Sequence, residues 1–235
     1  MVNDNIHIIS VAAGSGTRFG SETPKQFLPL DGKPVVMHAI DTFRQAFPGG
    51  KILLVLSGQT AGIWQGICRS MDYNSPDTVL GGATRTESVR HALDHIRKSG
   101  SVSDSDIIMI HDGARPLVTA ALAKKIASAL DGSSYAGAVP GYMPSDSIMR
   151  QTPECGQPAD RSEFRLVQTP QAFRAGVLIK AYDSMGDMVM SDDASVLSNF
   201  SSEKTTIVDG DRENIKITHP GDIQLAEFYI HRRKR

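Results

Sequence analysis

Short apolar runs alternate along this chain with segments of helical periodicity. The runs at residues 6–13, 51–57 and 106–111 are rich in isoleucine and valine and lack a regular alternation of polar positions. This pattern is typical of strands that are buried on both faces of a mostly parallel sheet. Weaker strands are predicted at residues 78–80, 136–140 and 204–208.

Helical patterns fill the intervals between these runs. Helices are predicted at about residues 34–46, 60–71, 84–98, 119–130, 174–199 and 220–231. Alternating strands and helices predict right-handed crossovers and a doubly wound, mostly parallel α/β sheet, with functional sites at the carboxyl ends of its strands. The length of 235 residues fits one such domain over residues 1–235.

The alternation stops after Pro140. Residues 141–172 contain four prolines, two glycines and scattered polar residues, with short strand-like pieces at 147–150 and 164–168. A segment of this composition does not suit another strand–helix unit. We therefore predict an extended β-arm that protrudes from the domain.

Composition narrows the classes of partner. With 25 basic and 26 acidic residues and a net charge of −1, the chain offers no global attraction for nucleic acid or for an anionic membrane. Cys68 and Cys155 fit neither a disulfide framework nor a metal cluster. The basic run at residues 231–235 is interpreted as a solvated tail. Without a membrane-spanning apolar stretch or a signal peptide, a cytoplasmic protein is expected.

A glycine loop, AAGSGTRFG, follows the first predicted strand. Its glycine spacing matches neither the dinucleotide-binding fingerprint nor the P-loop pattern. Gly14 and Gly16 would let backbone N–H groups approach an oxyanion, and Arg18 can donate two hydrogen bonds to phosphate oxygens. Lys25 follows a proline that restricts its direction. The loop is interpreted as a phosphate site, with a plain turn as the alternative.

Three further segments carry candidate chemistry. In LGGATRTES, Gly81 and Gly82 follow a strand and Ser88 lies near a helix N-terminus, which favours anion binding. Asp112 ends a buried strand, where it can bind Mg²⁺ or cap a turn. Lys216 is predicted in a short apolar strand, either as a site residue or as a lysine extending from a sheet edge.

Taken in order, AAGSGTRFG, PKQFL, GGATRTESV, HDGARP, DRSEFRLVQTPQAF and ENIKITHPGD resemble the 2-C-methyl-D-erythritol 4-phosphate cytidylyltransferase family of the non-mevalonate isoprenoid route. The resemblance covers about residues 6–230. It implies a Rossmann-like nucleotidyltransferase fold and in-line attack of a polyol phosphate on the α-phosphorus of CTP, releasing pyrophosphate. Because that phosphate is already anionic, neither a general base nor a covalent intermediate is needed.

The resemblance also implies roles for individual residues. Arg18 and Lys25 would stabilise the charge that develops at the α-phosphate, and Asp112 would bind Mg²⁺. The residues implied to line the nucleotide are Ala12, Ala13, Gly14, Gly16, Gly81, Gly82 and Ser88. Those implied at the acceptor are Arg115, Ser147, Arg161 and Lys216, with Arg161 and Lys216 holding its phosphate for attack. Ser147 departs from the threonine that the family often has, and VPGYMPSDS is longer than the usual connection.

The arm and the remaining alternatives complete the sequence-based hypothesis. Because the arm has no core of its own and embraces a second subunit in the family, a homodimer with composite sites is expected. A ribitol-5-phosphate cytidylyltransferase remains an alternative, although ADRSEF favours the erythritol enzyme. A non-catalytic nucleotide-binding module is expected to lack Lys25, Asp112 or Lys216, all of which are present. A dinucleotide-dependent oxidoreductase is disfavoured by Ser57 and Gly58, since an acidic residue is expected there.

Overall fold

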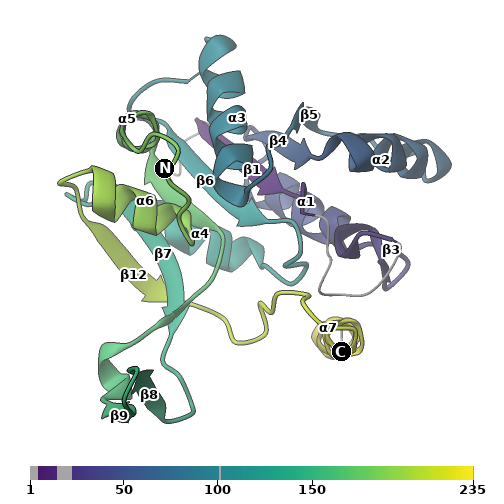
Figure 1. Cartoon of the computed structure of the whole chain (residues 1–235). Coiled ribbons are helices and arrows are strands. Elements are labelled where there is room, and N and C mark those ends of the chain that lie inside the picture. The colour runs from purple at the N-terminus through teal and green to yellow at the C-terminus, as the bar shows by residue number, and fades with distance from the viewer. Residues whose placement is uncertain (1–4, 15–22, 101, 235) are drawn as a thin grey trace.

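A computed structural model describes residues 5–14, 23–100 and 102–234, and its centre is one eight-stranded sheet (Figure 1). Its strands are β1 (Ile6–Val11), β4 (Lys51–Leu56), β5 (Asp77–Leu80), β6 (Ile107–Asp112), β7 (Gly137–Tyr142), β10 (Leu166–Val167), β11 (Gln171–Arg174) and β12 (Thr205–Asp209). The strand order is β10-β7-β11-β6-β1-β4-β5, and β12 also pairs with β7. Gly16 and Arg18 lie outside the described residues.

The predicted parallel core of the sheet is confirmed. Strand β1 lies between β4 and β6 in parallel register, with Val11 opposite Val55 on one side and Asp112 on the other. Strand β5 continues the parallel order, with Leu80 opposite Leu56. The loops that follow β1, β5 and β6 therefore emerge at the same edge of the sheet.

Helices cover both faces of this sheet, as a doubly wound fold requires. They are α1 (Val35–Ala46), α2 (Gly58–Ser70), α3 (Arg85–Lys98), α4 (Ala120–Ser128), α5 (Ala175–Ser184), α6 (Asp193–Phe200) and α7 (Gly221–Arg233). Ile9 and Ile108 pack in the cluster with α3, α5 and α6, whereas Ile8 and Met109 pack with α1 and α4. Successive strand residues thus enter opposite cores, which explains why the strands show no polar alternation.

Two predictions for the second half were wrong. The single helix expected over 174–199 is two helices, because Gly186 adopts a φ of +62° and Asp192 caps α6 by accepting from the Ser195 amide at 2.9 Å. Strand β11 was not predicted: its first two residues were expected in the arm, and its last residue was expected to begin this helix. Its four residues form instead an antiparallel strand between β6 and β7.

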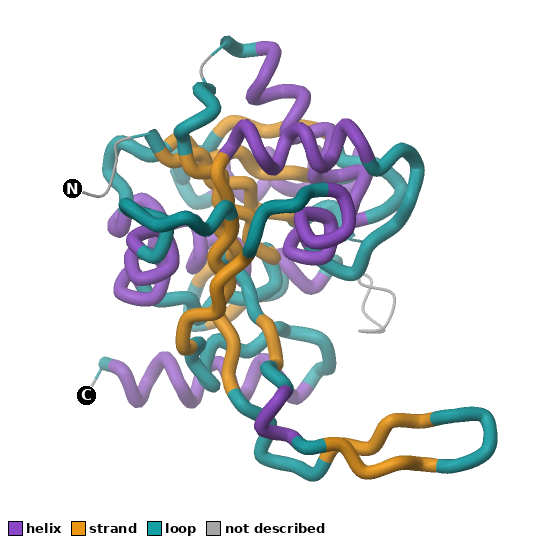
Figure 2. The backbone as a smooth tube through the Cα atoms, turned by 90° about the vertical axis from the view of Figure 1, so that its left-hand side faces the viewer, coloured by secondary structure: helices purple, strands orange, loops and turns teal. Residues whose placement is uncertain are grey.

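The protruding arm is confirmed but is shorter than predicted. Its tip is a hairpin of β8 (Ile148–Gln151) and β9 (Gly156–Ala159), which extends from the body in Figure 2. The strand-like piece predicted at 164–168 contains β10, which belongs to the main sheet, with Leu166 opposite Tyr142 on β7. A second small hairpin, β2 (Pro29–Leu30) with β3 (Lys33–Pro34), was not predicted. Among the described residues, no helix is both long and apolar enough to cross a bilayer.

Candidate active site

A cavity of about 420 Å³ opens at the sheet edge where β1, β5 and β6 end. Eight residues that the sequence predicted for the site line it: Ala12, Ala13, Gly14, Lys25, Gly82, Ser88, Asp112 and Lys216. They come from five stretches of the sequence, at residues 12–14, 25, 82–88, 112 and 216. We refer to this space as the nucleotide cavity, after the role that the family resemblance implies for the residues that line it.

The first loop of this cavity is held by a glutamine that sequence analysis did not select. Gln26 is buried, and its side-chain amide donates to the carbonyl oxygens of Ala12 at 2.6 Å and of Gly14 at 3.1 Å. These bonds tie the end of β1 to the short helical turn Lys25–Phe27. Gln26 thereby places Lys25 at the cavity wall. The signal for it was its position inside the PKQFL motif.

The second loop depends on two glycines for close packing. A β-carbon at Gly81 would lie 2.6 Å from Oγ of Ser88, and one at Gly82 would lie 2.2 Å from Cγ of Glu87. Ser88 is buried, and its hydroxyl accepts from the Gly82 amide at 3.1 Å. Gly81 therefore stands behind the cavity wall, while Gly82 and Ser88 form part of it.

Asp112 is the centre of a charged cluster at the end of β6. Its carboxylate lies 2.9 Å from Nζ of Lys216, 3.3 Å from Nε of Arg85 and 3.6 Å from Nε of Arg115. Burial alone would raise the pKa of Asp112, but the charges of Arg85 and Lys216 outweigh it and hold that pKa far below its usual range. The group is therefore a fixed carboxylate at physiological pH.

Lys216 does not lie in a strand, so that prediction was wrong. The segment between β12 and α7 is irregular, and its backbone is held by other loops instead of a ladder. The Ile217 amide donates to the Ala114 carbonyl at 2.8 Å, and Arg115 donates to the Asn214 carbonyl at 2.9 Å. The apolar pattern around Lys216 reflects Ile217, which is fully buried.

A smaller cavity of about 160 Å³ adjoins the nucleotide cavity and is also lined by Asp112 and Lys216. Arg115 lines this second space, which we name the acceptor cavity after the role that the family resemblance implies for Arg115 and Lys216. Ser147 and Arg161 line neither cavity. Arg161 instead donates to the Ser145 carbonyl at 2.6 Å within the arm, which Figure 2 shows extending away from the body.

Comparison with known proteins decides the family. Residues 6–232 match the family model of 2-C-methyl-D-erythritol 4-phosphate cytidylyltransferase. The chain belongs to this cytidylyltransferase family. It is therefore a nucleotidyltransferase that uses CTP, with the Rossmann-like fold that the resemblance implied.

Individual relatives agree with this family. A cytidylyltransferase of that name from Azobacteroides pseudotrichonymphae is 37% identical over 226 residues, covering 95% of this chain and 98% of the relative. The crystal structure of the Francisella tularensis enzyme is 28% identical with a TM-score of 0.77, covering 95% and 99% of the two chains. The Thermus thermophilus structure is 27% identical with a TM-score of 0.72, covering 95% and 98%.

Arg85 lies beside Ser88 in the second glycine loop, and the sequence analysis assigned it no role of its own. It begins α3 and lines both cavities. Its guanidinium contacts Asp112 at 3.3 Å and the fully buried Asp193 at 2.7 Å, and Asp193 also accepts from the Tyr182 hydroxyl at 2.6 Å. Arg85 therefore joins the end of β6 to the start of α6. The sequence feature that indicates Arg85 is its position at the start of a helix, directly after a glycine loop.

His111 is a buried core residue, and its hydrogen bonds identify its tautomer. Nε2 lies 3.0 Å from the Arg115 carbonyl, which can only accept, so Nε2 carries the proton. Nδ1 then accepts from the Thr169 hydroxyl at 3.2 Å, and that oxygen accepts from the Asp112 amide at 3.0 Å. Burial lowers the pKa of His111 to about 4. The neutral ring thus holds the Arg115 carbonyl directly and the Asp112 amide through the Thr169 hydroxyl.

Lowering the pH from 6.5 to 4 is expected to destabilise this cytidylyltransferase. With the pKa of His111 lowered from 6.5 to about 4, the unfolded chain binds a proton in this interval that the folded chain does not, which costs roughly 3 kcal/mol of unfolding free energy by pH 4. Denaturant titrations at several pH values measure how steeply the free energy of unfolding falls as the pH is lowered. His111→Gln is expected to flatten this slope, leaving a contribution from His38, whose pKa burial also lowers. An unchanged slope in this variant would contradict the assignment.

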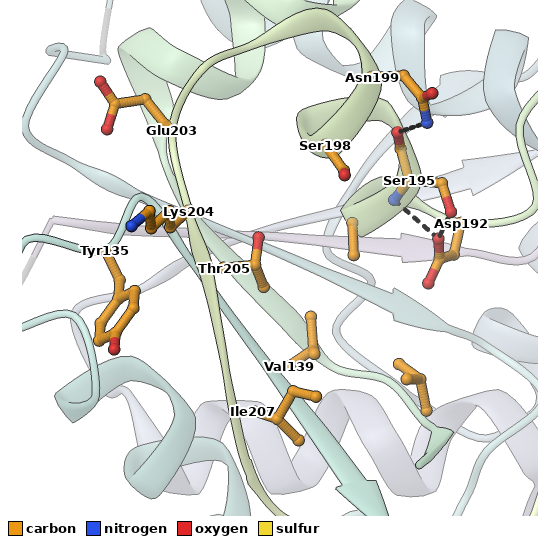
Figure 3. Close-up of a pocket in the computed structure, with 12 residues that line it drawn as sticks. Tyr135, Val139, Asp192, Ser195, Ser198, Asn199, Glu203, Lys204, Thr205 and Ile207 are labelled. Carbon is orange, nitrogen blue, oxygen red and sulfur yellow. Dashed lines mark hydrogen bonds between the residues drawn. The ribbon is translucent and has the colours of Figure 1, made fainter. Parts of the chain in front are cut away.

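A cavity larger than the nucleotide cavity lies elsewhere and suits the cytidylyltransferase substrates poorly. About 590 Å³ in volume, it lies between α6 and the strands β7 and β12, and includes Ser195, Thr205 and Ile207 (Figure 3). Its charged lining residues are Asp192, Glu203 and Lys204. Two carboxylates against one lysine do not favour a polyphosphate. The nucleotide cavity, although smaller, is lined by cations and glycine loops.

Proposed function

We propose that this chain transfers the cytidylyl group of CTP to 2-C-methyl-D-erythritol 4-phosphate in the two joined cavities. The observation that carries this proposal is the convergence of Lys25, Lys216 and Asp112 with both glycine loops around one cavity. CTP would occupy the nucleotide cavity, and the acceptor phosphate would occupy the acceptor cavity. Lys216 belongs to both, so it can contact the two substrates where they meet.

The proposed reaction is a direct displacement. An oxygen of the acceptor phosphate attacks the α-phosphorus of CTP, and the bond from that phosphorus to the β-phosphate oxygen breaks to release pyrophosphate. The protein supplies position and positive charge, because the attacking oxygen is already anionic. Lys25 would stabilise the charge at the α-phosphate, and Lys216 with Arg115 would hold the acceptor phosphate. Arg18, outside the described residues, would assist Lys25.

We propose Mg²⁺ as the divalent metal and Asp112 as its protein ligand. The described residues contain no cluster of three or more His, Cys, Asp or Glu side chains that could enclose a metal. A single ionised carboxylate at the cavity wall suits Mg²⁺, which usually takes one or two carboxylates and completes its shell with phosphate and water. When bound, the ion would neutralise charge on the CTP phosphates.

We also propose a homodimer in which each arm completes the partner's acceptor cavity. Ser147 and Arg161 flank the β8–β9 hairpin on its two sides in the sequence, and this hairpin protrudes from its own chain, which supports a role in a second subunit. Apolar side chains are exposed on the arm and near its base, at Met149 (56%), Leu166 (47%) and Ile207 (53%). Such a surface favours burial against another chain.

We propose a cytoplasmic location. The free thiols Cys68 and Cys155 suit a reducing compartment.

Pyrophosphate release tests the function directly. Purified protein with CTP and Mg²⁺ is offered 2-C-methyl-D-erythritol 4-phosphate or ribitol 5-phosphate. We expect rapid release with the first acceptor and little with the second. A preference for ribitol 5-phosphate would establish the sister activity, and no release with either would support a non-catalytic module.

Arg161→Ala is expected to weaken use of the acceptor and leave CTP binding nearly unchanged. The loss of one charge-assisted hydrogen bond lowers kcat/KM for the acceptor by roughly 10- to 150-fold. Steady-state kinetics with each substrate varied in turn measure the effect. Arg150→Ala, which alters a neighbouring arginine of the arm, is the matched control. Equal losses for both substrates would argue against an acceptor role.

Mixing two variants tests whether the site is composite. Consider a dimer of one Arg161→Ala chain and one Lys25→Ala chain. If each site takes Lys25 from one subunit and Arg161 from the other, one of the two sites has both native residues and the other has neither. If both residues come from the same chain, every site remains damaged. We expect activity to return when the unfolded variants are refolded together. No recovery, with mixed dimers demonstrated by mass, would exclude the composite site.

A further inference from the structure

The side chains of residues 231–234 in the basic C-terminal run are exposed, as the sequence-based interpretation expects, but this stretch is helical and ion-paired and is not a free tail. Residues 231–234 form the last turn of α7 and the residue after it, and we call them the basic turn. His231 and Lys234 contact Asp31 at 3.2 and 2.6 Å, and Arg232 is paired with Glu213. The basic turn therefore binds two other parts of the chain, the β2–β3 turn at Asp31 and the segment before Lys216 at Glu213.

Arg233 makes the most extensive contacts of this turn. Its Nε donates to Glu213 at 3.0 Å, its Nη2 donates to Asp211 at 3.0 Å, and its Nη1 donates to the Leu117 carbonyl at 2.9 Å. All three guanidinium nitrogens are thus used, and they reach two separate segments. A planar fork of donors is suited to this task, whereas a lysine offers one point of attachment.

The two segments that Arg233 joins are those that carry the acceptor-side cations. Glu213 precedes Lys216 by three residues, and Leu117 follows Arg115 by two. The segments also bond to each other, through Arg115 to the Asn214 carbonyl at 2.9 Å and through the Ile217 amide to the Ala114 carbonyl at 2.8 Å. Arg233, on the last turn of α7, adds a third link between the two segments through its bonds to Glu213 and to the Leu117 carbonyl.

The segment before Lys216 needs such external support. Between Gly210 and His219 it has no regular secondary structure, so no helix or ladder fixes the backbone. From the sheet side, Gln168 bonds the Asp211 and Asn214 carbonyls at 2.8 and 3.0 Å. The Arg233 contacts hold the same stretch from the side of α7.

We propose that Arg233 is a positioning residue for the acceptor phosphate. It would fix the Lys216 segment against the Arg115 loop, so that both cations face one phosphate. The proposal rests on the proposed function, which assigns Lys216 and Arg115 to the acceptor. Because Arg233 contacts neither the glycine loops nor Lys25 through any of these bonds, its influence is directed to the acceptor and not to CTP.

The test compares Arg233→Ala, Arg233→Lys and Lys234→Ala in the full-length enzyme. We expect Arg233→Ala to lower kcat/KM for the acceptor by about 10- to 100-fold while KM for CTP changes by less than about two-fold. Arg233→Lys is expected to recover part of this loss. Lys234→Ala is the matched control, since Lys234 belongs to the same turn but contacts Asp31, and it is expected to behave like the wild type.

Hydrogen exchange followed by mass spectrometry gives a readout that does not depend on activity. In Arg233→Ala, amides of residues 211–217 are expected to exchange faster, and those of β1 and β6 to remain protected. Unchanged exchange in 211–217, or faster exchange with unchanged acceptor kinetics, would overturn the proposal. So would equal losses for CTP and acceptor. If the wild type uses neither acceptor, the proposed function fails and the acceptor role of Arg233 fails with it. The exchange data would then still show whether Arg233 holds residues 211–217 in place, so the two failures can be told apart.

Discussion

Lys25→Ala lowers turnover by about 10²- to 10³-fold, the loss expected when a positive charge is removed from the transition state of a transfer between two anions. Lys25 lines the nucleotide cavity, next to Gln26, which anchors the first glycine loop. The fold is expected to survive, because the apolar contacts of this turn come from the buried Phe27. Single-turnover kinetics at saturating CTP and acceptor measure the effect.

Two comparisons sharpen this result. Lys25→Arg keeps the charge but is expected to recover only part of the rate, because a planar guanidinium does not replace an ammonium group at one oxygen. Lys33→Ala removes a lysine from the nearby β2–β3 hairpin, where it pairs with Asp41, and is expected to retain full turnover. A normal rate in Lys25→Ala would remove this residue from the mechanism.

Asp112→Asn is expected to lower activity by at least about 10²-fold at low magnesium, with partial recovery as magnesium rises. The substitution keeps the shape of the side chain and removes the charge that Arg85 and Lys216 surround. Activity titrated against magnesium concentration measures the change. The recovery is the informative part, because a carboxylate that only caps a turn would lose activity without any dependence on the metal.

Asp193→Asn serves as the matched control for that experiment. Asp193 is the other carboxylate bound to Arg85, is fully buried and lines neither cavity. Its substitution disturbs Arg85 and the start of α6, but it is expected to leave the magnesium requirement of the folded enzyme unchanged. A magnesium requirement that rises equally in both variants would show that Asp112 acts through Arg85 and not through the metal.

The parallel core and the nucleotide cavity could be predicted because their signals are local. Buried strands such as β1 and β6 contain continuous apolar runs, and a glycine loop beside a lysine is visible within a few positions. Because parallel strands end at a common edge, Gly14, Gly82 and Asp112 could be expected to meet without any contact being known. The family resemblance then supplied the roles.

What the sequence did not reveal depends on partners that are distant along the chain. The short β11 is a strand because β6 and β7 lie on either side of it, not because of its own four residues. Lys216 is placed by side chains of Arg115 and Gln168 that bond its neighbours. The ion pairs of the basic turn were missed for the same reason, since its partners Asp31 and Asp211 are distant in the sequence.

The antiparallel pairing at the base of the arm has a consequence for how acceptor specificity can evolve. Tyr142 and Leu166 lie directly opposite each other, so the chain leaves the sheet and returns to it at adjacent points. Two ends held in this way can be joined by a two-residue turn such as Asn-Gly. Residues 143–165 are thus an insertion between β7 and β10, and the pairing of these two strands does not depend on it. With the acceptor role proposed above for the arm, exchange of this insertion as one unit would alter the polyol phosphate that is used, while the core of the sheet is inherited intact.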